Sequence, residues 1–253
     1  MDSNYYIEYF PLERNHWWFR ARQKILIEHI SSLRLGANTN VLNIGIATGA
    51  TSEMLEQFGA VKSVEYDKEC YDFVKQKLPK LDLDLGSITD LSYPDNSYDL
   101  VCAFDVIEHV EDDKKAVSEI IRVCKPEGHV VVTVPAFQYL WGQHDIVNHH
   151  YRRYTKKEFK KLFQQGGTIS YSAYFNFFLF FPIFFFRISS RILPKGFLRQ
   201  ENKPESDFSV FQPNWFKNVC YKIMLSERFF IRKKITLPFG VSILISFRKN
   251  KIY

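Results

Sequence analysis

The stretch VLNIGIATG, residues 41–49, decides the fold of this chain. Its first four residues are mostly apolar and predict a buried strand, and the small residues from Gly45 to Gly49 predict a tight turn. Residues 51–58 follow with Met54, Leu55 and Phe58 at helical spacing. A strand, a glycine turn and a helix in this order place free amide groups at the helix start, where the backbone can approach a ligand closely.

The same alternation of short apolar strands and amphipathic helices continues outward from this unit. We expect strands at residues 61–65, 81–86, 98–104 and 129–134, helices at 51–58, 68–77 and 113–123, a turn at 125–128, and late strands at 168–175 and 240–248. This order predicts a doubly wound α/β fold, with a mostly parallel sheet covered by helices on both faces. Ligands of such sheets bind beyond the carboxyl ends of the strands.

Composition indicates an ordinary globular protein with two unlike halves. The chain has 253 residues, 46% of them hydrophobic and 25% charged, which is enough for one large α/β domain. Residues 1–150 carry 14 basic and 23 acidic side chains, whereas residues 151–253 carry 20 and 5. The four cysteines show no paired spacing, so we expect reduced thiols in a cytoplasmic protein. The longest apolar run has twelve residues, too few for a transmembrane helix.

Glu65 stands at the end of the second expected strand, twenty positions after Gly45. A carboxylate at this spacing suits the two hydroxyl groups of an adenosine ribose. The alternative is a tight turn followed by a solvated glutamate. The turn is two glycines short of the dinucleotide fingerprint, which disfavours a nicotinamide or flavin cofactor.

Four motifs resemble the class I S-adenosylmethionine-dependent methyltransferases, in the broad group that includes quinone-biosynthesis enzymes: VLNIGIATG, VEYD, LGSITDLSYPDNSYDLVCAFDVIEHVEDD and CKPEGHVVVTVP. The resemblance implies a seven-stranded, Rossmann-like sheet, S-adenosyl-L-methionine as cofactor and S-adenosyl-L-homocysteine as product. It implies that the glycine turn meets the methionine end of the cofactor and that Glu65 holds the ribose. The implied cofactor-binding residues are Asn43, Gly45, Ala47, Gly49, Glu65, Tyr66, Ser87, Ile88, Phe104 and Asp105.

Three of these positions depart from the family pattern. Asn43 stands where the family usually has an acid, Ala47 where it has glycine, and Ser87 where it has aspartate. Asparagine and serine still form hydrogen bonds and alanine adds one methyl group, so we expect altered binding of the cofactor rather than none. The alternative is a catalytically degenerate protein of the same fold that binds membranes or partners.

Two further segments, LERNHWWFRARQKIL (residues 12–26) and WGQHDIVNHHYRRYT (141–155), together with PFGVSIL, resemble a subgroup found among bacterial cell-envelope glycan genes. The first predicts an amphipathic helix that folds over the cofactor as a lid. In the second, His144, Asp145 and His149 are the candidate catalytic residues, because a histidine paired with a carboxylate can remove a proton from an acceptor. The alternative is that this polar cluster only fixes the loop. These three residues lack a fourth ligand, so we expect no metal site. We expect Glu108 and His109 to be structural.

The segment from Phe175 to Arg199 begins with eight phenylalanines in twelve residues, followed by basic side chains. Such a segment is typical of a helix that binds the surface of an anionic membrane. The alternative is a hydrophobic acceptor pocket or an oligomer interface. We expect one domain, with a helical lid (residues 1–35), a cofactor-binding core (36–165) and the last strands with a helical insertion (166–253). The expected acceptor is small or amphiphilic and includes lipid-linked molecules, and no nucleic-acid partner is expected. The sequence does not indicate the oligomeric state.

Overall fold

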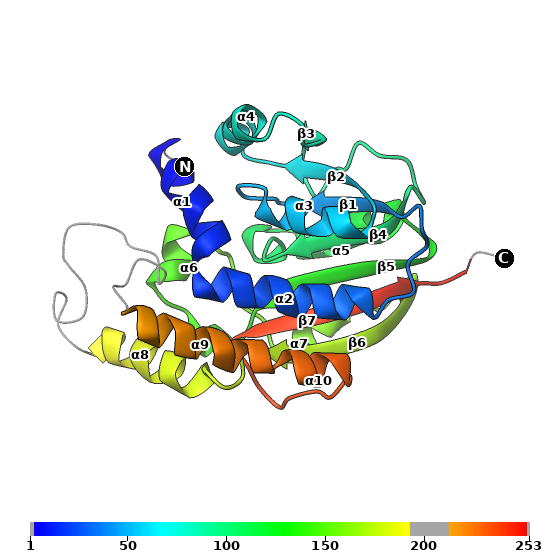
Figure 1. Ribbon diagram of the computed structural model, residues 1–253. Helices are drawn as coiled ribbons and strands as arrows, with labels where there is room; N and C mark the ends of the chain where they lie inside the picture. Colours follow the sequence, from blue (N-terminus) through cyan, green and yellow to red (C-terminus); the bar gives the residue numbers. More distant parts are fainter. Residues whose placement is uncertain (1–2, 193–212, 252–253) are drawn as a thin grey trace.

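The computed structural model describes residues 3–192 and 213–251. Its centre is a seven-stranded sheet with the order β3-β2-β1-β4-β5-β7-β6 (Figure 1). Strand β7 runs antiparallel to both of its neighbours, and the other pairings are parallel. The strands are β1 (Asn40–Ile44), β2 (Ala60–Glu65), β3 (Leu83–Leu85), β4 (Tyr98–Phe104), β5 (Cys124–Pro135), β6 (Gly167–Phe175) and β7 (Ser242–Lys249). The predicted doubly wound, mostly parallel α/β fold is confirmed.

The register of the central strands brings their carboxyl ends to one edge. Ile44 of β1 pairs with Val64 of β2 on one side and with Ala103 of β4 on the other. The strand order reverses between β1 and β4, because β2 and β3 extend the sheet one way and β5 the other. Ligands of open α/β sheets bind in the crevice at such a reversal. The fold therefore places the candidate site just beyond Ile44, Glu65 and Phe104.

Helices cover both faces of the sheet (Figure 1). They are α1 (Ser3–Asn15), α2 (Trp17–Ser31), α3 (Ala50–Leu55), α4 (Lys68–Lys77), α5 (Asp113–Val123), α6 (Gln143–Val147), α7 (Lys156–Lys161), α8 (Phe180–Ile192), α9 (Asn214–Ser226) and α10 (Arg228–Arg232), with 3₁₀ turns at Glu56–Phe58, Ile107–His109 and Gln138–Leu140. Ile25 of α2 and Met224 of α9 share one buried cluster with Val131 of β5. On the opposite face, Ile120 of α5 and Phe159 of α7 pack with other side chains of the sheet.

Two predicted elements differ from the structure at their boundaries. The expected turn at residues 125–128 lies inside β5, where it forms a bulge: the register passes from Tyr98–Cys124 to Leu100–His129, and Glu127 has a φ of 63°. The single helix expected over residues 12–26 is two helices separated at His16. The His16 side chain caps α2 by accepting a hydrogen bond from the Trp18 amide at 3.3 Å.

The phenylalanine-rich segment has two environments. Phe175 ends β6 with no exposure, and Phe180 at the start of α8 is buried, whereas Phe181 and Phe185 are 52% and 62% exposed. Within the described residues, 3–192 and 213–251, no helix is both long and apolar enough to span a bilayer. The basic residues Lys195 and Arg199 lie outside the described residues. All four cysteines are free, as the sequence predicted, and the structure places all four in the interior.

Candidate functional site

A cavity of about 1080 Å³ opens beyond the carboxyl ends of β1, β2 and β4. The glycine turn and Glu65 line one end, and histidines from the loop after β5 line the other. Helices α1 and α2 contribute Tyr9, Phe19 and Arg22, and Leu179 and Ile183 come from the turn before α8 and from α8 itself. Single small-molecule pockets measure about 300–1,000 Å³, so this cavity has room for a nucleoside cofactor together with an acceptor.

The glycine turn directly follows β1. Its tight bend requires backbone conformations that most residues avoid. Gly45 has a φ of 67°, Ala47 of 48° and Gly49 of 92°. A Cβ on Gly45 would lie 2.5 Å from a methyl group of Val106. Gly45 and Ala47 line the cavity, whereas Gly49 lies behind the turn, packed close to Leu78, and caps α3.

Glu65 is buried against this turn. One carboxylate oxygen accepts from the Ile46 amide at 3.1 Å, and the other accepts from the amides of Tyr66 and Asp67 at 2.9 and 3.0 Å. Burial raises the pKa of Glu65, and the amide hydrogen bonds oppose that rise. An ionised carboxylate offers about four acceptor positions, so it retains capacity for a ligand hydroxyl at the cavity wall. This arrangement fits a ribose.

The remaining predicted cofactor residues divide into two groups. Tyr66, Ser87, Ile88, Phe104 and Asp105 line the cavity with Glu65. Asn43 does not, because its amide nitrogen donates to the hydroxyls of Thr51 and Ser52, at 2.9 Å each, behind the turn. Asn43 therefore braces α3 instead of facing the cavity.

Helix α1 is tied to the glycine turn by two charged residues that the sequence analysis did not select. The Thr48 hydroxyl donates to the buried carboxylate of Glu13. The neighbouring Arg14 donates to the Thr48 carbonyl at 3.1 Å and to Glu53 at 2.7 Å. Burial raises the pKa of Glu13. Nothing in the local sequence pairs residues 13 and 48, since their contact arises only when α1 folds over the turn.

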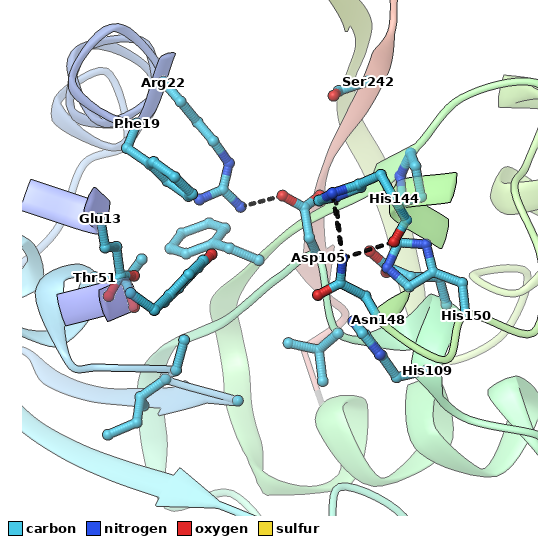
Figure 2. A pocket seen from close by; sticks show the side chains of 18 of the residues that line it. Glu13, Phe19, Arg22, Thr51, Asp105, His109, His144, Asn148, His150 and Ser242 are labelled. Carbon is cyan, nitrogen blue, oxygen red and sulfur yellow. Dashed lines mark hydrogen bonds and ion pairs between the residues drawn. The ribbon is translucent and has the colours of Figure 1, made fainter. Parts of the chain in front are cut away.

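Arg22 reaches into the cavity from α2 and meets Asp105 at the end of β4 (Figure 2). Its Nη2 lies 2.5 Å from Asp105 Oδ2 and 3.1 Å from the Thr133 hydroxyl. The guanidinium is 5.6 Å from the ring centre of Phe104 and 5.5 Å from that of Trp18. The lid helix is therefore joined to the sheet by a largely buried ion pair.

The opposite wall of the cavity comes from the loop between β5 and α7. Asp145 is fully buried, with Oδ1 2.8 Å from His150 Nδ1 and 2.7 Å from Arg153 Nε. Burial alone would raise the pKa of Asp145, but the His150 hydrogen bond and the charges of Arg153 and Arg187 hold it well below its usual range. These contacts of Asp145 therefore hold the loop in place.

Of the three predicted catalytic residues, only His144 lines the cavity. Asn148 Nδ2 lies 3.2 Å from its Nδ1 (Figure 2). Asp145 is buried behind the cavity wall, and His149 is exposed outside it because the chain turns there with a φ of 54°. The turn directs the next residue, His150, inward instead. Glu108 and His109 also line the cavity, and burial lowers the pKa of His109 to about 4.

Arg187 of α8 also departs from its predicted environment. The sequence analysis counted Arg187 among the basic side chains of the segment Phe175–Arg199, which were expected to face an anionic membrane. In the structure it is 7% exposed, donates to the Leu140 carbonyl and lies 3.6 Å from Asp145. The buried carboxylate of Asp145 attracts the guanidinium inward, so Arg187 belongs to the cavity wall and does not meet a membrane.

Known proteins with similar sequences include methyltransferases. Residues 42–132 match the family described as a methyltransferase domain. This part of the chain is a methyltransferase domain, and it is similar to S-adenosylmethionine-dependent methyltransferases. A probable S-adenosylmethionine-dependent methyltransferase of Mycolicibacterium smegmatis is 30% identical over 125 residues, covering 49% of this chain and 48% of the relative. A demethylmenaquinone methyltransferase of Renibacterium salmoninarum is 33% identical over 93 residues, 36% of this chain and 39% of that protein. The chain thus spans about half or less of the length of these relatives.

Solved structures share the fold of the methyltransferase domain across most of the chain. An S-adenosylmethionine-dependent methyltransferase of Mesorhizobium loti has a TM-score of 0.56 at 13% identity, covering 90% of this chain and 98% of its own. The Haemonchus contortus phosphoethanolamine N-methyltransferase 2, solved with S-adenosyl-L-methionine, has a TM-score of 0.57 at 17% identity. The match covers 91% of this chain and 53% of that protein. At these identities the likeness concerns the fold alone.

Proposed function

We propose that this protein transfers a methyl group from S-adenosyl-L-methionine to a small or amphiphilic acceptor. The observation that carries the proposal is the single cavity that joins the glycine turn and Glu65 at one end to His144 and the apolar face of α8 at the other. Methyl transfer needs cofactor and acceptor in one water-poor space, and this cavity has the size for both.

On the cofactor side, Glu65 holds the ribose hydroxyls, Phe104 and Ile88 flank the base, and the glycine turn approaches the methionine end. When bound, the cofactor supplies an electrophilic methyl carbon on sulfur. The protein's part is to align the acceptor with that carbon and to exclude water, and α1 and α2 close the cavity for this purpose.

On the acceptor side, His144 takes a proton from the acceptor's nucleophilic atom. Its ring faces the cavity and is oriented by Asn148 (Figure 2). An unperturbed histidine has a pKa of about 6.5, which suits a general base near neutral pH. Asp145 acts as a positioning residue, because it holds the loop through Arg153 without touching the cavity.

The acceptor we propose has an apolar part, as in an isoprenoid or lipid-linked intermediate of cell-envelope glycan or quinone metabolism. Pro182, Ile183 and Phe186 of α8, together with Leu179 just before the helix, present an apolar wall to the cavity. The demethylmenaquinone methyltransferase among the relatives is consistent with this class. On the outer side, Phe181 and Phe185 of α8 and Trp215 of α9 are more than half exposed, and we propose that they contact anionic membrane.

Titration calorimetry with S-adenosyl-L-methionine and S-adenosyl-L-homocysteine tests the cofactor side. Glu65→Gln should weaken both by about 10- to 100-fold, since the amide replaces an acceptor of a charge-assisted hydrogen bond. Glu69→Gln, on the exposed side of α4, is the matched control and should bind as the wild type does. A wild-type protein that binds neither compound would support the alternative of a degenerate membrane- or partner-binding protein.

Two experiments test the acceptor side. Mass spectrometry of membrane and soluble extracts incubated with the enzyme and deuteromethyl-labelled cofactor should show the label in a membrane-extracted lipid. The protein should sediment with phosphatidylglycerol vesicles, and the double variant Phe181→Ser/Phe185→Ser should sediment less. Label confined to soluble compounds, with no sedimentation by the wild type, would remove the lipid-linked acceptor from the proposal.

A further inference from the structure

We infer that Glu108, His109 and His150 form a binding site for one divalent transition-metal ion. Each of these side chains offers one ligand atom, and the three atoms lie within 4.8 Å of one another. All three residues line the large cavity. Two imidazoles and one carboxylate are ligands that Zn²⁺ and its first-row neighbours prefer.

Two separate loops supply the ligands, and a backbone hydrogen bond joins these loops. Glu108 and His109 lie on the 3₁₀ turn Ile107–His109 after β4, whereas His150 follows α6. The Tyr151 amide donates to the Glu108 carbonyl at 2.8 Å, directly beside His150. The rings of His109 and His150 meet edge to face with their centres 4.5 Å apart. The convergence of the three ligands therefore follows from a fixed contact between the loops.

Glu108 gives the strongest reason for an ion. Its side chain is fully buried, and neither carboxylate oxygen has a hydrogen-bond partner among the described residues. A buried carboxylate without partners is destabilising unless a cation compensates it or a proton neutralises it. A metal ion bound between Glu108 and the two imidazoles supplies that compensation.

A carboxylate behind His150 completes the arrangement. Asp145 Oδ1 lies 2.8 Å from His150 Nδ1, which leaves Nε2 as the ring nitrogen that can bind the ion. Arg153 in turn holds the same Asp145 oxygen at 2.7 Å. A carboxylate bonded to the far nitrogen of a ligating histidine is a recurring feature of metal sites, where it sets the tautomer and the ring orientation.

This trio differs from the one that the sequence suggested. The sequence analysis weighed His144, Asp145 and His149 and expected no metal, because those three residues lack a fourth ligand. In the structure the glutamate and one histidine come from a different segment of the chain, the 3₁₀ turn after β4. Three protein ligands leave coordination positions that face the cavity. An oxygen of the acceptor could occupy one of them, and this last consequence rests on the proposed function.

Metal binding can be measured without any methyl transfer. The purified full chain is treated with a chelator, dialysed, and titrated with CoCl₂ by visible absorption and with ZnCl₂ by calorimetry. We expect one ion per chain, with ligand-field bands of Co²⁺. Glu108→Gln and His150→Asn should each weaken binding at least about 100-fold, and Asp145→Asn about 10- to 100-fold. His149→Asn, which removes an exposed histidine of the same loop, should bind as the wild type does.

The result that overturns the site is a wild-type protein that binds no ion, or a folded Glu108→Gln variant with wild-type affinity. Circular dichroism identifies variants that fail to fold, and His109→Asn then replaces them as the test of the site. Calorimetry with S-adenosyl-L-homocysteine on the same metal-free protein is independent of this outcome. Cofactor binding without metal binding would therefore reject the metal site and leave the proposed methyl transfer intact.

Discussion

Arg22 and Asp105 form an ion pair, with 2.5 Å between Nη2 and Oδ2, that joins the lid to the carboxyl end of β4. The two partners are buried to different extents, since the side chain of Arg22 is 5% exposed and that of Asp105 is 28% exposed. Asp105 also adopts a φ of 58°, a left-handed conformation that aspartate and asparagine tolerate better than most residues. The pair therefore joins the lid to a cavity-lining residue in the left-handed conformation.

Removing the two charges should have unequal effects on stability. Asp105→Asn keeps the left-handed backbone but leaves the buried guanidinium without its counter-charge, so we expect it to lower the free energy of unfolding by about 3 kcal/mol. Arg22→Met preserves most of the packing and leaves a partly hydrated carboxylate, so its effect should be about 1 kcal/mol. Urea denaturation of both variants measures the difference, and the opposite ranking would contradict it.

Ala47→Gly should stabilise the protein, against the usual effect of glycine. Ala47 has a φ of 48°, which costs a residue with a Cβ about 1 kcal/mol that glycine avoids. The removed methyl group also widens the cavity at the glycine turn, so the affinity for S-adenosyl-L-homocysteine should stay equal or rise. Ala116→Gly in the middle of α5 is the control and should destabilise by about 1 kcal/mol. An equal loss in both variants would show that Ala47 is not strained.

The strands and helices of the cofactor-binding half could be predicted because each one has its own local signal. The boundaries of β4, α4 and α5 match the predicted residues, since apolar runs and helical spacing are properties of consecutive residues. The bulge in β5 has the sequence Lys-Pro-Glu-Gly, which predicts a turn, whereas the pairing of β5 with β4 on both sides of it keeps it within the strand.

The cavity wall could be predicted only in part. Glu65 and Asp105 follow strands directly, so topology alone places them at the site. Arg22, Glu13 and His150 were missed because their positions depend on contacts between segments far apart in the sequence. The orientation of His149 and His150 depends on the positive φ of His149. The polar sequence from His144 to Tyr154 contains no pattern that predicts this angle.

Stability should fall as the pH is lowered from about 6.5 to 4, in part because of His29. This histidine is 2% exposed, stacks on Tyr171, and has a pKa that burial lowers to about 4. In the unfolded chain His29 has the ordinary pKa of about 6.5. Between pH 6.5 and 4 the ring is therefore protonated in the unfolded state but neutral in the folded state, which favours unfolding. The resulting slope is at most about 1.4 kcal/mol per pH unit. Above pH 6.5 the ring is neutral in both states and contributes no slope.

His29→Leu tests this assignment, because leucine cannot bind the proton. Denaturation curves at several pH values should show a smaller loss of stability for the variant than for the wild type between pH 6.5 and 4. The two proteins should change in parallel above pH 7. Parallel curves throughout the acid range would show that His29 does not carry the effect.

Glu227 should control the position of α8 and hence the apolar wall of the cavity. Its buried carboxylate accepts from the amides of Asn176, Phe177 and Phe178 at 2.6, 2.8 and 3.2 Å, which fixes the connection from β6 to α8. Burial raises its pKa to about 7. Glu227→Ala leaves three amide groups without their acceptor, so we expect the free energy of unfolding to fall by about 3 kcal/mol.

Glu227→Gln distinguishes the effect of the hydrogen-bond acceptor from the effect of the negative charge. The amide keeps one oxygen for the Phe177 and Phe178 amides but directs its NH₂ group at the Asn176 amide, so it should lose about half as much stability as Glu227→Ala. Wild-type Glu227 should contribute a decline in the free energy of unfolding as the pH rises from 4.5 to 7, opposite in sign to the contribution of His29, and Glu227→Gln should lack this contribution. That decline arises because the folded state, with the raised pKa, holds a proton that the unfolded carboxyl has already released. Hydrogen exchange of residues 176–178 measures the local effect, and unchanged protection in both variants would mean that Glu227 does not hold this connection.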